Sequence, residues 1–115
     1  MSSFSDQSKS YLEKLVRIAE NSPKAIGYES ITVDGTVKRL TPPIDTTYAI
    51  ATLESVDTGV AARYLETLST TVSSTVGLPV TSLQSIDILD YQNIINFQII
   101  RVQSGATTLK VQYYR

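Results

Sequence analysis

Five carboxylates between residues 54 and 90 have the chemistry for catalysis or metal binding: Glu54, Asp57, Glu66, Asp87 and Asp90. A pair of carboxylates can serve as acid and base in glycoside hydrolysis, and a cluster can bind Ca²⁺. None of the five forms a D-x-D-x-D-type loop, and the interval between Asp87 and Asp90 is common at solvated strand edges. We interpret these side chains as solvated or structural.

The chain contains neither cysteine nor histidine. Thiolate nucleophiles, disulfides, imidazole bases and the usual zinc ligands are therefore missing. The five glycines are scattered at positions 27, 35, 59, 77 and 105, each next to a predicted turn, so no phosphate-binding loop is formed. We expect a protein that is not an enzyme and that uses no metal or other cofactor.

Seven tyrosines could form a binding surface: Tyr11, Tyr28, Tyr48, Tyr64, Tyr91, Tyr113 and Tyr114. Aromatic rings stack on sugars, so exposed tyrosines could bind carbohydrate. Tryptophan, the stronger stacking residue, is absent. A tyrosine in a small β domain more often buries its ring and keeps its hydroxyl at the rim. Burial is the favoured interpretation, and glycan binding stays open as an alternative.

Size and charge restrict the class of protein further. The chain has 115 residues, 42% of them hydrophobic, and a formal net charge of -1. This length suits one domain with one core, and the charge balance argues against nucleic acid as a partner. No apolar run approaches the ~20 residues that span a bilayer, and the N-terminus lacks the order of a secretion signal. We expect a soluble protein without a membrane partner.

The elements that would position these side chains fall into two predicted units, an N-terminal arm at residues 1–25 and a β domain at residues 26–115. In the arm, apolar residues recur at helical spacing and predict a helix from about Asp6 to Glu20. A helix this short is marginal alone in water, so its apolar stripe must dock, either on its own sheet or on a neighbouring subunit. The predicted contact residues of the arm are Phe4, Tyr11, Leu12, Leu15, Val16 and Ile18.

From Ile26 onward, turn signals arrive about every ten residues, as in all-β sandwiches or barrels. The segment from Ile26 to Leu40 predicts a hairpin around Asp34-Gly35, a favoured two-residue loop. Two prolines predict a rigid loop over residues 41–47. Strands are predicted at residues 48–55 and 60–66, as one short strand within the exposed connection 67–82, at 83–91, in the apolar segment 94–102 and at 107–115. The expected fold is an antiparallel, jelly-roll-like β-sandwich of about seven or eight strands with an N-terminal α-helix.

Several strand motifs resemble a family of small β-sandwich proteins found among the virion proteins of tailed bacteriophages. The resemblance covers about residues 26–115. It lies in a Tyr-Ala-hydrophobic strand, an Arg-aromatic strand, a hydrophobic strand before a Ser/Gly turn, and a closing strand of Leu-x-Val-x-Tyr-Tyr type. The matching positions are Tyr48, Ala49, Ile50, Arg63, Tyr64, Phe97, Ile100, Leu109, Val111, Tyr113 and Tyr114. The chain departs from the pattern after the Arg-aromatic strand, where it has "LETLSTTVSS" in place of an acidic, Gly-containing loop.

The resemblance implies a non-enzymatic structural protein of a phage virion, assembled in the host cytoplasm. Its partners would be the major capsid protein or other virion proteins, together with further copies of the chain in a homo-oligomer. The leading hypothesis is capsid decoration, with the arm packed on the shell or on a sister subunit. A head-fibre anchor or a neck or tail component is the alternative within the virion. The arm could form a short trimeric helical bundle. The spacing between successive residues alternates between four and three positions, as in a coiled coil, in the set Phe4, Ser8, Tyr11, Leu15 and Ile18. A carbohydrate-binding adhesion module is the alternative from another class.

Overall fold

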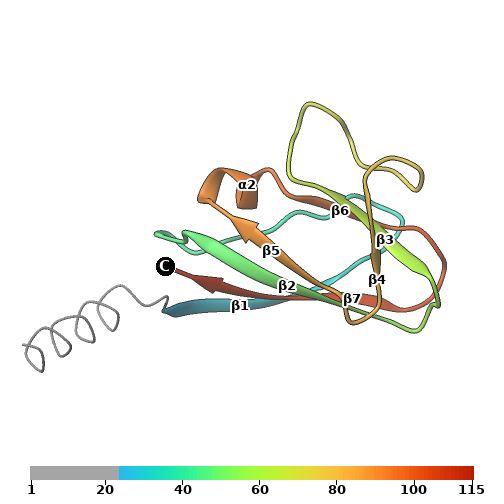
Figure 1. Ribbon diagram of the computed structural model, residues 1–115, viewed down its shortest axis with the longest axis horizontal. Coiled ribbons are helices and arrows are strands. Elements are labelled where there is room, and N and C mark those ends of the chain that lie inside the picture. The colour runs from blue at the N-terminus through green and yellow to red at the C-terminus, as the bar shows by residue number, and fades with distance from the viewer. Residues whose placement is uncertain (1–23) are drawn as a thin grey trace, which may run out of the picture.

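The computed structural model describes residues 24–115 (Figure 1). The predicted helix and all six predicted contact residues of the arm lie outside this range. The described part is mainly β, with seven strands and one short helix, which agrees with the predicted class. The elements are β1 (Ala25–Thr32), β2 (Tyr48–Ser55), β3 (Val60–Leu65), β4 (Leu78–Thr81), β5 (Ser85–Leu89), α2 (Tyr91–Ile95), β6 (Gln98–Arg101) and β7 (Thr107–Tyr114).

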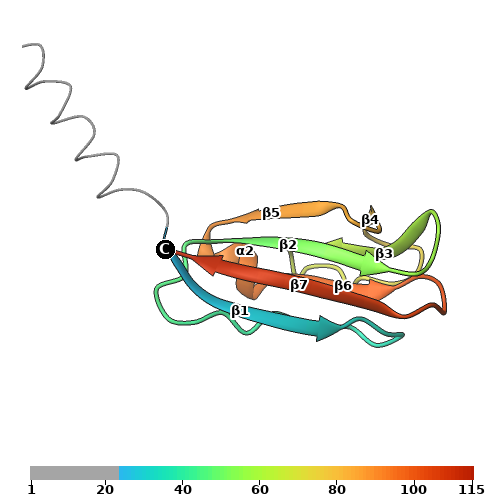
Figure 2. The ribbon, with the colours of Figure 1, turned by 90° about the horizontal axis from the view of Figure 1, so that it is seen from below.

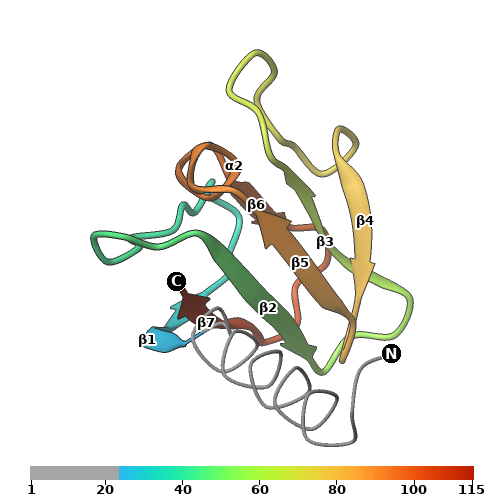
Figure 3. The same ribbon diagram turned by 60° about the vertical axis from the view of Figure 1, so that its left-hand side comes forward.

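The strands form two antiparallel sheets. A four-stranded sheet has the order β1-β7-β2-β5, and a three-stranded sheet has the order β4-β3-β6. Figure 2 shows β1, β7, β2 and β5 side by side, and Figure 3 shows β4 at the outer side of the smaller sheet. The terminal strand β7 is central, since β1 and β2 each pair with almost its whole length.

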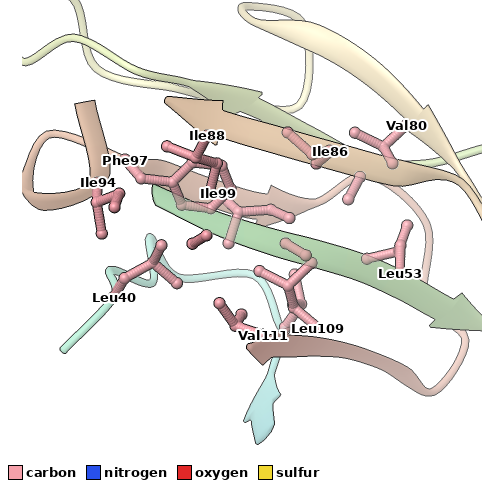
Figure 4. Close-up of a cluster of buried hydrophobic side chains, with 14 of the residues drawn as sticks. Leu40, Leu53, Val80, Ile86, Ile88, Ile94, Phe97, Ile99, Leu109 and Val111 are labelled. Carbon is pink, nitrogen blue, oxygen red and sulfur yellow. The ribbon is translucent and has the colours of Figure 1, made fainter. Parts of the chain in front are cut away.

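One hydrophobic core lies between the two sheets, because alternate residues of each strand point inward. Figure 4 shows this cluster, to which β2, β5 and β7 contribute from one side and β4 and β6 from the other. Ala49 and Ala51 of β2 and Ala61 and Ala62 of β3 are fully buried as well. These small side chains leave room for the larger members of the core, which are Leu53, Ile88, Ile94, Phe97, Ile99, Leu109 and Tyr113.

The predicted hairpin between Ile26 and Leu40 is wrong. The chain does turn at Asp34, whose carboxylate accepts hydrogen bonds from the backbone N–H and the hydroxyl of Thr36. Residues 37–40 then cross to the other sheet, where Lys38 forms an isolated bridge with Ile99 of β6. The crossing buries Leu40 in the shared core, and β1 pairs with β7 instead.

Two further expectations need correction. The apolar segment 94–102 is not a single strand, because Ile94 and Ile95 belong to α2 and the strand β6 begins only at Gln98. Gly27 does not mark a turn. It lies within β1, where a Cβ atom would stand 2.7 Å from the Cγ of Pro43. The glycine is needed here for the close approach of the 41–47 loop to the sheet.

Candidate functional site

The outer face of the four-stranded sheet carries three tyrosines, and we call it the tyrosine face: Tyr28, Tyr48, Ile50, Thr52, Asp87, Leu89, Lys110, Gln112 and Tyr114. Alternation along the strands places these residues opposite the core-facing set. Register then brings them together, since Tyr48 stands between Tyr114 and Leu89, and Ile50 stands between Gln112 and Asp87. Strands far apart in the sequence thus build one continuous surface.

Two tyrosines of this face stack on each other. The rings of Tyr48 and Tyr114 are nearly parallel, with an interplanar angle of 3° and centroids 4.7 Å apart. The hydroxyl of Tyr114 lies 3.1 Å from the side-chain oxygen of Gln112, to which it donates a hydrogen bond. Partial burial raises the pKa of Tyr48, and the neighbouring Tyr114 and Asp87 raise it further. Tyr48 therefore stays neutral at physiological pH, and the two stacked rings form an aromatic plate.

A shallow depression of about 190 Å³ lies beside this plate. Its side chains come from β1, β2 and β7 and combine an exposed ring, an aliphatic floor and polar groups: Tyr28, Ile50, Thr52, Lys110, Gln112 and Tyr114. The ring of Tyr28 is 63% exposed. A ring, an amide, a hydroxyl and an ammonium within one depression suit a partner that offers both apolar surface and hydrogen-bonding groups.

A hydrogen-bonded carboxylate on the inner side holds this end of the sheet in place. Glu29 of β1 accepts hydrogen bonds from the hydroxyl of Tyr113 and from the backbone N–H and hydroxyl of Thr41, the last two at 2.9 and 2.7 Å. Burial raises the pKa of Tyr113, and its hydrogen bond to Glu29 adds to the effect. The network ties the 41–47 loop to β1 and β7, directly behind the tyrosine face.

A second exposed apolar feature lies at the opposite end of the sheet. Val56 and Leu83 are 76% and 77% exposed and border a broad, shallow depression with Glu54, Ala106 and Thr108. Leu83 has a left-handed backbone with φ of 68°, which is unusual for a residue with a large side chain. This geometry presents the leucine outward from the turn between β4 and β5.

The five carboxylates form no common site. Asp57 accepts a hydrogen bond from the backbone N–H of Gly105, which fixes two loops together. Glu66 is partly buried, and burial raises its pKa. Within residues 24–115, no group of three or more acidic, histidine or cysteine side chains could hold a metal ion. No helix in that range has the length and hydropathy needed to cross a membrane.

The residues that carry the family resemblance lie in three different places. Phe97, Leu109, Val111 and Tyr113 are buried in the core. Tyr64 stacks on Phe97 with centroids 5.6 Å apart, and Ile100 is partly buried. The guanidinium of Arg63 donates to the backbone oxygens of Ser74 and Gly77, and so holds the loop before β4. Tyr48, Ile50 and Tyr114 belong to the tyrosine face.

Sequence reasoning named tyrosines as a possible binding set but did not group them. Lys110 and Gln112 were not singled out, although their alternation with Leu109, Val111 and Tyr113 placed them on the opposite face of the terminal strand. Comparisons of the chain with protein-family models, with curated proteins and with solved structures found no match. The candidate site therefore depends on its geometry alone.

Proposed function

We propose that the protein is a non-enzymatic structural component of a tailed-phage virion, a capsid decoration protein anchored through its N-terminal arm. The observation that carries the proposal is the tyrosine face, an exposed and largely preformed surface with three aromatic rings. Tyrosine is enriched where proteins bury one another's surface, because its ring is apolar and its hydroxyl can still find a partner. A binding role by burial suits this surface.

The order of the strands supports the same proposal. A jelly roll has eight strands in two sheets, and it occurs in viral capsid proteins and in lectins. The order β1-β7-β2-β5 opposite Lys38-β6-β3-β4 follows the jelly-roll pattern, with one strand reduced to the single bridge between Lys38 and Ile99. We infer a jelly-roll β-sandwich with seven full strands. Because one fold serves many functions, this likeness supports a virion role only together with the resemblance and the tyrosine face.

In this proposal the arm and the β domain have separate tasks. The arm would bury its apolar stripe on the shell or on a sister subunit, and the β domain would add contacts through the tyrosine face. A specific interface buries about 800 Å² per partner, and repeated subunits on a shell gain avidity from modest individual contacts.

Deletion of residues 1–22 tests the anchoring role. The deletion leaves all seven strands intact, and Lys24 keeps its two backbone hydrogen bonds to Arg115. We expect the shortened protein to keep its circular dichroism spectrum and its unfolding transition but to lose binding to particles. Normal particle binding by the folded, shortened protein would refute the anchor.

A matched pair of substitutions shows whether particle binding is lost because the apolar stripe of the arm is disrupted or only because a negative charge is added. Leu15→Glu places a carboxylate on the predicted apolar stripe, and Ser10→Glu adds the same charge on the opposite side of the predicted helix. Only Leu15→Glu should weaken particle binding.

The copy number of the protein in purified particles tests its position. A count similar to that of the shell protein indicates decoration, and far fewer copies indicate a fibre, neck or tail position.

Carbohydrate binding is the second candidate, and the depression beside Tyr28 favours it. An exposed ring next to the amide of Gln112 and the ammonium of Lys110 suits a sugar ring and its hydroxyls. A glycan array with the full chain tests this candidate, with Tyr28→Ala as the matched variant. An array without signals above background, or with signals that Tyr28→Ala leaves unchanged, would exclude glycan binding at this face.

A further inference from the structure

The free edge of β1 carries unpaired backbone groups. In an antiparallel pair, residues alternate between those bonded to the neighbouring strand and those that point away from it. Val33 donates to the oxygen of Thr107, and Val56 donates to the oxygen of Ala106. With the observed registers, Gly27, Glu29 and Ile31 therefore face β7, and the N–H and C=O groups of Tyr28, Ser30 and Thr32 point away from the sheet. Among residues 24–115 these groups have no hydrogen-bond partner.

The other three sheet edges are protected in ways that β1 is not. The strand β4 has four residues and contains Pro79, and β6 is covered by its bridge with Lys38. The strand β5 has five residues with the charged Asp87 at its centre. By contrast, β1 has eight residues without proline, lysine or arginine, and its one charge, Glu29, is turned inward to Tyr113. Natural proteins protect long edges because such edges pair with other chains.

We propose that β1 pairs with β1 of a second copy of this chain in an antiparallel, two-fold arrangement centred on Ser30. The edge is self-complementary in this register. Ser30 stands opposite Ser30 of the second copy, so their hydroxyls can hydrogen-bond, and Tyr28 stands opposite Thr32, an aromatic and β-branched pair. Glu29 stands opposite Ile31, so no like charges meet. Tyr28, Ser30 and Thr32 all gain backbone partners on both copies.

The pairing joins two four-stranded sheets into one sheet of eight strands. Figure 2 shows β1 as the outermost strand of its sheet, next to β7. Because Tyr28 belongs to both the edge and the tyrosine face, the two tyrosine faces become neighbours across the two-fold axis. The dimer thus doubles the surface to which the proposed function assigns partner binding. The pairing itself rests on the free edge and not on that function.

Opposite charges at position 30 test the pairing in the purified full-length protein. Ser30→Lys and Ser30→Glu each place like charges directly opposite each other, which should raise the dimer dissociation constant at least tenfold in analytical ultracentrifugation. An equimolar mixture of the two variants should restore the dimer as a heterodimer. Ser85→Lys is the matched control, because it adds the same charge on β5, the opposite edge strand of the sheet. It should leave the dimer unchanged.

Single cysteines test the register, since the chain has none of its own. In a bonded antiparallel pair the Cα atoms of Ser30 in the two copies lie about 5.5 Å apart. Thr32 of one copy faces Tyr28 of the other, four residues away from the second Thr32, so the two Thr32 Cα atoms lie roughly 13 Å apart along the strand. A short bis-maleimide should cross-link Ser30→Cys at least several-fold faster than Thr32→Cys or Ser85→Cys.

Three results would overturn the proposal: a wild-type monomer at every concentration up to the solubility limit, a dimer that Ser30→Lys leaves intact, or equal cross-linking at positions 30 and 32. No particles are present in these experiments. Failure of the pairing therefore leaves the decoration role untouched, and failure of particle binding leaves the pairing untouched.

Discussion

Replacement of Gly27 by alanine should destabilise the protein, because β1 and the 41–47 loop approach each other too closely for a methyl group. The new Cβ atom would stand 2.7 Å from the Cγ of Pro43, whereas carbon atoms in contact prefer about 3.5–4.0 Å. The shortfall is roughly 1 Å. Neither side can yield easily, since Pro43 is a ring and its loop is held by hydrogen bonds from Thr41 to Glu29 and from Thr46 to the Pro43 oxygen.

The expected magnitude follows from two opposing effects. Overpacking costs about 1–3 kcal/mol, and the loss of glycine's freedom in the unfolded chain returns about 0.4–1 kcal/mol. The net loss should be about 1–2 kcal/mol. For a domain of this size, such a loss lowers the melting temperature by roughly 4–10 °C. Urea unfolding should show a lower midpoint and an unchanged slope, because the surface exposed on unfolding stays the same.

Two further variants make the reasoning refutable. Gly35→Ala is the matched control, because a Cβ atom at Gly35 meets nothing within 4 Å. It should leave stability unchanged or raise it slightly. Pro43→Ala removes the ring atoms that cause the clash, so Gly27→Ala should cost less than half as much in the Pro43→Ala background. An equal cost in both backgrounds would show that the close contact is not the cause.

Three other changes have definite expected outcomes. Burial raises the pKa of Glu66 above its usual 4.5, so the folded state binds this proton more tightly than the unfolded state and loses stability as the pH rises. Glu66→Gln should therefore stabilise the protein by up to about 1 kcal/mol at pH 7 and have no such effect near pH 4, as measured by urea unfolding at both pH values. Tyr113→Phe removes a buried hydrogen bond to Glu29 and should cost about 2 kcal/mol in the same assay; an unchanged midpoint would contradict that role. Tyr28→Ala changes an exposed ring, so it should leave the melting temperature within about 2 °C but weaken particle binding at least tenfold, and equal binding would remove the tyrosine face from the proposed interface.

The strands that the sequence predicted well are those with a strong local signal. Alternation in the segments 48–55 and 107–115 identified β2 and β7, because side chains of a half-buried strand repeat every two residues. Central and edge strands share this period, so alternation did not show that β7 lies between β1 and β2. The choice of partner depends on which pairing buries Val33 and Leu40, and that is a property of the whole core.

The failed hairpin has the same cause. Asp34-Gly35 is a sound turn signal, and the chain does turn there, but a turn does not decide which strand the next residues meet. Lys38 bridges Ile99, which is distant in the sequence. The short helix α2 was missed for a different reason. It has only five residues, and so short an apolar segment does not show whether its hydrophobic residues repeat with the period of a helix or of a strand.

The tyrosine face shows why the candidate site could not be read from the sequence. Tyr28, Tyr48 and Tyr114 lie on three strands, and a shift of one residue in any register would turn a ring into the core and a core residue to the surface. The β2–β7 register pairs Tyr48 with Tyr114, and the β1–β7 register, which is regular from Gly27 onward, brings Tyr28 beside Gln112. For this reason the Gly27→Ala variant bears on function as well as stability. If the contact with Pro43 sets the position of β1, a folded Gly27→Ala protein should show altered chemical shifts across Tyr28 and Tyr114, and Gly35→Ala should not.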